Sequence, residues 1–97
     1  MSLPVVFRRI ARLEFEESIA WYDAQQAGLG VQFAAEIENL LERISDSPQQ
    51  FPHVRNRIRR AVSTRFPYTV HYITEKERIV VLAIFHVKRN PTQLEGR

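Results

Sequence analysis

The sequence predicts a single α+β domain in which a two-helix hairpin packs on one face of a small antiparallel sheet. Three observations predict this fold: two stretches with helical periodicity fill most of the first half of the 97 residues, three β-leaning runs fill the second half, and a short β-leaning run precedes the helices. The predicted order is therefore β-α-α-β-β-β, over residues 1–97 and without a linker or an internal repeat. A chain of this length has room for one hydrophobic core.

The first predicted elements are a short strand and a helix. The run from Leu3 to Phe7 consists mainly of branched and aromatic residues, as strands do. From Arg9 to about Gln26, apolar residues wrap more than one helical face, and Trp21 and Tyr22 among them are predicted to belong to the core. Because glycine adopts left-handed backbone angles without strain, we predict that Gly28 caps the C-terminal end of this helix.

The second helix is predicted from about Val31 to Ser45. Its apolar residues recur at the i, i+3, i+4, i+7 spacing of one helical face, and its charged residues lie on the opposite face. Because only a few residues separate the two helices, they must fold back on each other as an antiparallel hairpin. The following segment, from Pro48 to Arg57, contains Pro48 and Pro52 and is predicted to be an irregular loop.

Three strands are predicted in the second half. They are Ile58–Thr64, Tyr68–Thr74 and Ile79–Val87. The charged residues 75–77 form the predicted hairpin loop between the last two. Ile79–Phe85 is apolar at every position, which predicts the central strand of the sheet, covered on both faces for part of its length. Tyr68 and Tyr72 share a strand face, and we interpret this face as packing on the helices, with stacking on nucleic-acid bases as the alternative.

Charge is distributed unevenly between the two halves. Residues 1–47 contain 4 Lys and Arg against 8 Asp and Glu, whereas residues 48–97 contain 10 against 3. The net charges of these halves are −4 and +7, which gives +3 for the whole chain. A basic, strand-rich half predicts a surface that meets a polyanion or an acidic partner. The small total argues against strong nonspecific binding, so a plain nucleic-acid-binding module is the weaker alternative.

Several classes of site are absent from the sequence. The chain has no cysteine, which excludes a disulfide scaffold, a thiolate metal site and a cysteine nucleophile. His53, His71 and His86 lack metal-ligand spacing, and there is no glycine-rich phosphate loop or paired-carboxylate motif, so we expect no metal and no cofactor. The longest apolar run is too short to span a membrane and no secretory signal is present, so the expected location is the cytoplasm.

Five arginines form the densest group of charge in the chain. They lie within eleven residues that contain no acid, and they are Arg55, Arg57, Arg59, Arg60 and Arg65. Guanidinium groups bind phosphate and carboxylate oxygens well. The alternatives are a charged edge strand that resists sheet-to-sheet aggregation, and pairing with the glutamates of the helices. The concentration of the five favours a binding surface.

His86 is the sharpest single candidate for chemistry. It has the side-chain parity of Val80, Leu82 and Ile84, and it lies where the last strand runs into a polar segment. Histidine is the usual general acid or base near neutral pH. The alternative is a histidine at the end of a strand that makes one structural hydrogen bond.

Six short motifs keep a recognisable order and spacing from about residue 4 to residue 92. They are Ile19-Ala20-Trp21-Tyr22, Gly28-Leu29-Gly30-Val31-Gln32-Phe33, Ser47-Pro48-Gln49-Gln50-Phe51-Pro52, Arg59-Arg60, Arg65-Phe66-Pro67-Tyr68 and His86-Val87-Lys88-Arg89-Asn90-Pro91. With them, the sequence resembles the RelE/ParE superfamily of bacterial toxins, the toxic halves of type II toxin–antitoxin modules, often called plasmid stabilisation proteins. The fold of that superfamily, a helical hairpin against a small antiparallel sheet, agrees with the predicted order of elements.

The resemblance implies a growth-arresting toxin that a cognate antitoxin holds inactive. The antitoxin's C-terminal segment is expected to cover the basic face, and the assembly could be a homodimer or a toxin–antitoxin hetero-oligomer. The superfamily divides by target: RelE-like members cut mRNA in the ribosomal A site, whereas ParE-like members poison DNA gyrase and are not nucleases. We expect the ParE-like function, with mRNA cleavage as the alternative and a different target or no present toxicity as a further one.

The resemblance also assigns roles to particular residues. The residues expected to bind phosphate or the target are Arg59, Arg60, Arg65, Lys88 and Arg89. If the chain is a nuclease, His86 and Arg65 are its expected catalytic residues. RelE-like nucleases tend to carry several lysines in the middle strands, but the only lysines here are Lys76 and Lys88, which favours the ParE-like branch.

Overall fold

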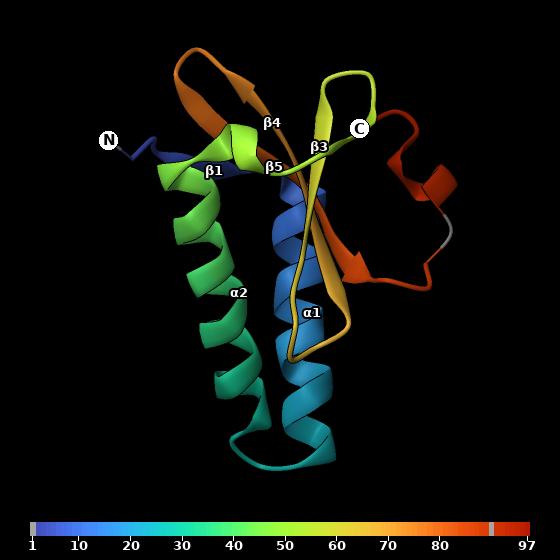
Figure 1. The fold of residues 1–97 in the computed structure, drawn as a ribbon. Helices are drawn as coiled ribbons and strands as arrows, with labels where there is room; N and C mark the ends of the chain where they lie inside the picture. The colour runs from blue at the N-terminus through green and yellow to red at the C-terminus, as the bar shows by residue number, and fades with distance from the viewer. Residues whose placement is uncertain (1, 90) are drawn as a thin grey trace.

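The computed structural model describes residues 2–89 and 91–97 and has the predicted α+β architecture (Figure 1). Two helices pack on a five-stranded sheet with the strand order β1-β5-β4-β3-β2. The elements are β1 (Val5–Phe7), α1 (Arg9–Gln25), α2 (Leu29–Asp46), the 3-10 helix η1 (Pro48–Gln50), β2 (His53–Arg55), β3 (Ile58–Val62), β4 (Tyr68–Glu75), β5 (Arg78–His86) and the 3-10 helix η2 (Pro91–Leu94). Within the described ranges, neither α1 nor α2 combines the length and hydropathy that a membrane span requires.

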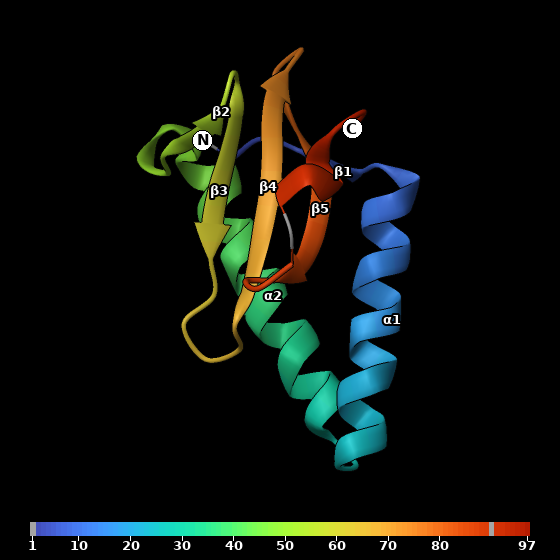
Figure 2. The ribbon, with the colours of Figure 1, turned by 90° about the vertical axis from the view of Figure 1, so that its right-hand side faces the viewer.

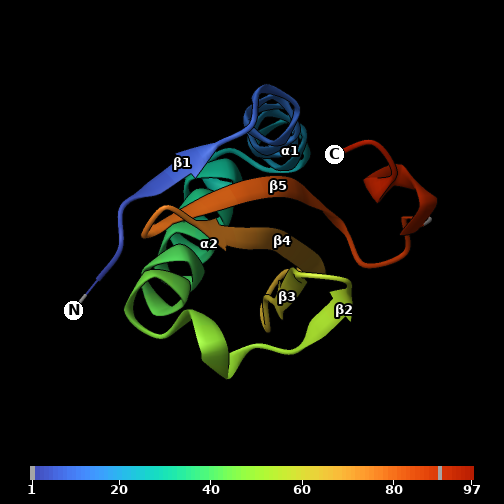
Figure 3. The same ribbon diagram turned by 90° about the horizontal axis from the view of Figure 1, so that it is seen from above.

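The sheet is antiparallel except at one pair. The strands β2 to β5 follow one another through short connections, so their directions alternate. By contrast, β1 runs parallel to β5, with Val5 opposite Ile79 and Phe7 opposite Val81. The two helices separate β1 from the other strands, so no tight turn fixes its direction. The predicted antiparallel sheet is thus confirmed, with the parallel pair of β1 and β5 as a correction. Figure 3 shows the strand order from above.

The core lies between the helical hairpin and one face of the sheet (Figure 2). The predicted apolar stripe of α2 is buried, since Phe33, Ile37 and Ile44 have no exposed surface. They meet residues of β4 and β5 in a single cluster that also includes Tyr72 and Ile84. Burial of several large apolar side chains at about 1.5–3 kcal/mol each provides most of the stabilisation of such a domain.

The prediction of an irregular loop between residues 48 and 57 is wrong. The segment contains η1 and the short strand β2, which pairs antiparallel with β3 through His53 and Arg59. Pro48 is the first residue of η1, a position whose backbone N–H would make no hydrogen bond within the helix, so proline is tolerated there. Pro52 directly precedes β2. Because β2 is an edge strand of only three residues, the nearby prolines cost it no essential ladder bond.

The turn between the helices differs in detail from the prediction. Gly28 has the expected left-handed conformation, with φ of 88°, but it precedes α2 as its N-cap residue, while Gln26 caps α1. The carboxylate of Asp23 accepts hydrogen bonds from the N–H groups of Gly28 and Gly30, at 3.0 and 3.2 Å. A Cβ atom at Gly30 would lie 2.6 Å from the carbonyl oxygen of Ile19, so only glycine permits this close helix approach.

A bulge in β5 reverses the side-chain alternation near its end. His71 lies opposite Ala83 and Tyr72 opposite Val81, so Leu82 is an extra residue. Val80 and Leu82 therefore lie in a different cluster from Ile84, which joins the main core. The predicted parity of His86 with Val80 and Leu82 is wrong for this reason. The middle strand of the sheet is β4, so the predicted central position of Ile79–Phe85 is wrong. The predicted cover on both faces of β5 is confirmed, because Leu94 of η2 packs on its second face.

Candidate target-binding surface

The sheet face away from the helices is basic at one side. Along β3, Ala61 points into the main core, and the side chain of Arg60 points to the opposite face. Arg60, Arg55 and His71 line a pocket of about 250 Å³, together with residues of the C-terminal segment. We call the surface formed by Arg55, Arg60, His71 and the C-terminal residues of this pocket the open face. Arg55 and Arg60 give it cationic side chains and Val54 and Leu94 an apolar wall, while Glu95, which pairs with Arg55 at 3.9 Å, also lines it. Cationic and apolar groups side by side can receive a charged protein segment or a phosphate group.

Four of the five clustered arginines already have polar partners. The partners are Glu95 for Arg55 at 3.9 Å, Glu75 for Arg57 at 3.1 Å, the carbonyl of Phe51 for Arg59 at 2.6 Å, and the side-chain oxygen of Gln32 for Arg65. The alternative that helix glutamates neutralise this group is therefore wrong. Of these five arginines, only Arg60 has a guanidinium without a polar partner among residues 2–89 and 91–97, which leaves it available to an external anion.

Arg59 and Tyr72 hold the segment that follows α2. The hydroxyl of Tyr72 donates to the carbonyl of Pro48 at 2.6 Å, and Arg59 donates to the carbonyls of Gln49 and Phe51 at 3.4 and 2.6 Å. Burial raises the pKa of Tyr72 to about 12, and the nearby Arg59 opposes that rise. Because the guanidinium of Arg59 donates to backbone oxygens of the segment after α2, its contacts are those of a residue that stabilises this segment.

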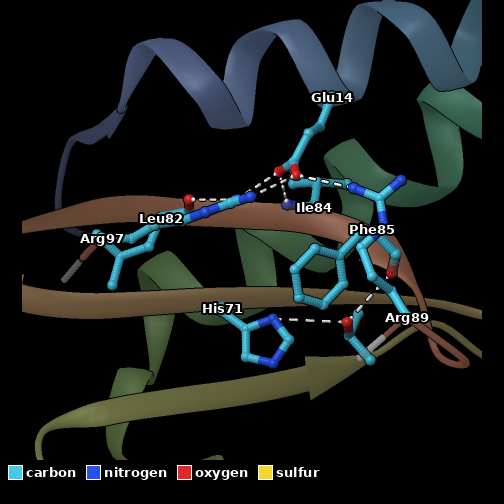
Figure 4. A network of polar contacts seen from close by, with 8 residues as sticks. Glu14, His71, Leu82, Ile84, Phe85, Arg89 and Arg97 are labelled. Carbon is cyan, nitrogen blue, oxygen red and sulfur yellow. Dashed lines mark hydrogen bonds and ion pairs between the residues drawn. The ribbon is translucent and has the colours of Figure 1, made fainter. Parts of the chain in front are cut away.

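His71 is a buried histidine that the sequence reading did not select. It is 5% exposed, and its ring contacts that of Phe85, with 5.0 Å between the ring centres. The hydroxyl of Thr69 donates to the carbonyl of Phe85 at 3.2 Å, so the Nδ1 atom of His71, at 3.5 Å from that hydroxyl, is the donor (Figure 4). Burial, and then the charges of Arg60 and Arg97, lower the pKa of His71 to about 4. The ring is neutral at physiological pH.

His86 lies at the end of β5 beside Tyr68. Its ring is half-buried and meets the Tyr68 ring at an angle of 71°, with 5.7 Å between the centres. The backbone N–H of Lys88 donates to Nδ1 of His86 at 3.1 Å, so the proton of the neutral ring is on Nε2. One ring nitrogen therefore makes the structural hydrogen bond that the sequence reading named as the alternative, and Nε2 remains for any acid or base role.

The predicted site residues do not form one constellation. Arg59 contacts the segment after α2, Arg65 contacts Gln32 on α2, and Arg89 donates to Glu14 on α1 at 3.1 Å. The side chain of Lys88 is exposed. Asn90, which belongs to the last sequence motif, lies outside the described residues. No group of three or more His, Asp or Glu side chains that could hold a metal ion occurs in the described part of the chain.

Among the described residues, the polar side chain with the most hydrogen bonds is a glutamate that the sequence did not indicate. Glu14, 8% exposed, accepts hydrogen bonds from the backbone N–H of Ile84 at 3.1 Å, from Arg97 at 2.9 Å and from Arg89 at 3.1 Å (Figure 4). Arg97 also donates to the carbonyl of Leu82 at 3.3 Å. We call Glu14, Arg89 and Arg97 the Glu14 corner.

The Glu14 corner replaces a missing strand. Among the described residues, β1 pairs only with the first part of β5, so the N–H of Ile84 and the carbonyl of Leu82 lack a neighbouring strand. The side chains of Glu14 and Arg97 satisfy these two groups. The sequence motifs did not single out Glu14. Glu14 lies three residues after the fully buried Ala11 and therefore on the same face of α1. This spacing is the signal in the sequence that could have indicated its burial.

The aromatic residues near the end of α1 divide into two kinds. Tyr22 packs on Phe33, Phe66 and Tyr68, with ring centres 4.9 to 5.9 Å apart, so its predicted core role is confirmed. The same contacts confirm that the face of Tyr68 packs on the helices. Trp21 is 57% exposed, and its predicted core role is wrong, because the side of α1 that carries it faces away from the main core. It lines a groove of about 210 Å³ with Glu17 and Arg89.

Comparisons with known proteins agree with this architecture. A family model described as "ParE toxin of type II toxin-antitoxin system, parDE" matches residues 5–91. A solved structure titled "Chromosomal ParDE TA system from P. aeruginosa" matches with a TM-score of 0.77 and 13% sequence identity, over 88% of this chain and 96% of that one. A comparison with curated proteins found no significant match. The resemblance drawn from the sequence motifs is confirmed on its ParE-like branch, and the chain belongs to the ParE toxin family of type II toxin–antitoxin systems.

Proposed function

We propose that this chain is a growth-arresting toxin that inhibits DNA gyrase in the cytoplasm and is neutralised by a cognate antitoxin. The observation that carries the proposal is the family match over residues 5–91, which includes both the helical hairpin and the basic strands. Under this proposal the toxin acts by binding, and it needs a rigid surface of suitable shape and charge.

The open face supports a binding role for Arg60. Its guanidinium is exposed and lies opposite His71 in the register of β3 and β4. Because its donors have no partner among the described residues, Arg60 can bind a carboxylate or phosphate oxygen without first breaking an internal contact. A complex of gyrase with DNA presents both kinds of oxygen. An acidic or amphipathic antitoxin segment would compete for the same surface.

The geometry favours binding over RNA cleavage. Cleavage needs a base for the 2′-hydroxyl, an acid for the leaving oxygen and cations beside the phosphate. The Nδ1 atom of His86 accepts a backbone hydrogen bond, and Arg65 and Arg89 are bonded to different helices. mRNA cleavage is therefore the alternative that the experiment must separate from gyrase inhibition.

The proposal is tested by expressing the chain in bacteria with and without the neighbouring gene. We expect growth arrest without the neighbour, rescue with it, and DNA breaks in the arrested cells that a toxin-resistant gyrase prevents. The Arg60→Ala variant tests the role of the open face, because it should fold normally but arrest growth less. Ribosome-dependent mRNA fragments in cells with intact DNA would contradict gyrase inhibition and support mRNA cleavage. Normal growth without the neighbouring gene would contradict both functions.

A further inference from the structure

A groove runs between β1 and α2, on the edge of the sheet farthest from β2. Its volume is about 530 Å³. Val5 and Phe7 of β1 and Leu41 of α2 form an apolar floor, and Glu38, Glu42 and Asp46 of α2 form an acidic wall. The groove therefore has the apolar floor and the charged side that an amphipathic segment requires.

The backbone of β1 is open on the groove side. Within the described residues, β1 pairs with β5 alone. The N–H of Ile79 donates to the carbonyl of Pro4, and the N–H of Arg8 donates to the carbonyl of Val81. Because backbone groups alternate along a strand, Val6 also faces β5, whereas the N–H and C=O groups of Val5 and Phe7 point outward. An incoming extended segment can pair with these groups.

The acidic wall specifies the charge of that segment. Glu38, Glu42 and Asp46 follow one another at intervals of four residues and so lie on one face of α2. None of the three forms an ion pair with a described residue. Carboxylates repeated along a groove favour lysine or arginine side chains on the segment that fills it.

We propose that an extended segment of the cognate antitoxin adds to β1 in this groove, with apolar side chains on the floor and basic side chains toward α2. The inference rests on the proposed function. It assigns the antitoxin a second contact, distinct in place and in charge from the basic open face, at the opposite edge of the sheet. Strand addition provides affinity through backbone hydrogen bonds, and the acidic wall provides specificity.

The first test measures the affinity of the purified toxin for its antitoxin by calorimetry. Reversing the charge at an exposed wall position with Glu42→Lys should weaken binding about tenfold, and Glu38→Lys with Glu42→Lys should weaken it further. Glu16→Lys is the matched control, since Glu16 is exposed on α1 away from the groove, and it should bind as the wild type does. Glu42→Gln, which removes the charge without reversing it, should have an intermediate effect.

The second test follows hydrogen exchange at β1. We expect the outward amides of Val5 and Phe7 to exchange quickly in the free toxin and slowly in the complex, while the Val6 amide, bonded to β5, is slow in both. Equal affinity of the Glu42→Lys and Glu16→Lys variants, with no new protection at Val5 and Phe7, would overturn the inference. Protection that appears without antitoxin and grows with toxin concentration would assign the groove to a second copy of this chain and also overturn it. If the antitoxin does not bind the wild type at all, the proposed function itself fails.

Discussion

Two regions of this molecule use arginine in opposite ways. In the Glu14 corner, the side chain of Arg97 is 8% exposed and is bonded to a carboxylate and a backbone carbonyl. On the open face, the guanidinium of Arg60 is exposed and has no polar partner among the described residues. The same residue type thus completes the fold at one edge of β5 and remains available for binding at the other side of the sheet.

The difference follows from the cost of burying charge. An arginine and a carboxylate that are both removed from water must satisfy each other, and removing either one leaves an unpaired charge. An exposed arginine keeps its hydration, so its loss changes stability little. Side chains of the first kind should therefore matter for folding, and those of the second kind for partner binding. Four predictions test this division, in decreasing order of the expected effect on stability.

The largest effect is expected from Glu14→Ala. The change removes the partner of the buried Arg97 and leaves the N–H of Ile84 unsatisfied, so the free energy of unfolding should fall by about 3–5 kcal/mol. Urea unfolding measures it. Glu16→Ala, at an exposed position of the same helix, should change stability by less than about 0.5 kcal/mol. Equal losses in both variants would contradict the structural role of the Glu14 corner.

The second effect concerns pH and His71. In the unfolded chain this ring takes up a proton as the pH falls through its ordinary pKa of 6.5, whereas in the folded protein its pKa is lowered to about 4. The contribution of the neutral His71 ring to the free energy of unfolding is therefore fully present above about pH 6.5. It falls by at most about 3 kcal/mol as the pH drops to about 4, and then levels off. Unfolding measured across this range should show a steeper fall for the wild type than for His71→Gln, while His53→Gln, at an exposed position, should keep the wild-type slope.

The third effect concerns the segment after α2. Tyr72→Phe removes the donor to the Pro48 carbonyl, a bond of 2.6 Å in the buried interior, and should destabilise the protein by about 1–2 kcal/mol. Tyr68→Phe is the matched control, because the Tyr68 ring packs in the aromatic cluster and should lose little when its hydroxyl is removed. Thermal unfolding of the two variants measures the difference. A loss for Tyr68→Phe as large as that for Tyr72→Phe would contradict this assignment.

The smallest effect on stability is expected at Arg60. Arg60→Ala should leave the free energy of unfolding within about 0.5 kcal/mol of the wild type, yet reduce growth arrest. Its neighbour in sequence supplies the comparison: Arg59→Ala removes the hydrogen bonds to the carbonyls of Gln49 and Phe51 and should destabilise the protein by about 1–2 kcal/mol. If Arg60→Ala unfolds easily, or if it arrests growth as the wild type does, Arg60 is not a free binding residue.

The sequence predicted the fold well because local periodicity dictated it. The stripe of α2 and the apolar run of β5 are each visible in a short window, and both are buried as expected. What could not be predicted depends on contacts between distant segments. The bulge at Leu82 reverses the side-chain alternation of β5, and it exists only in the register of β5 against β4. The short edge strand β2 is visible only once β3 lies beside it.

The candidate site was predicted less completely. The concentration of arginines was evident, but which of them is free depends on acids and carbonyls far away in sequence, such as Glu75 for Arg57. The burial of Glu14 likewise depends on Arg97, 83 residues away. Composition could indicate that this half of the chain is basic. Only the fold separates the arginines that stabilise the protein from Arg60, which has no polar partner among the described residues.

The most direct test of this account uses purified gyrase, plasmid DNA and ATP. The wild-type chain should cause gyrase-bound DNA breaks to accumulate and should inhibit supercoiling, and equimolar antitoxin should prevent both effects. Arg60→Ala should fold as the wild type does and produce fewer breaks at the same concentration. Normal supercoiling without breaks at saturating toxin, combined with mRNA cleavage on ribosomes, would contradict gyrase inhibition as the function of this chain.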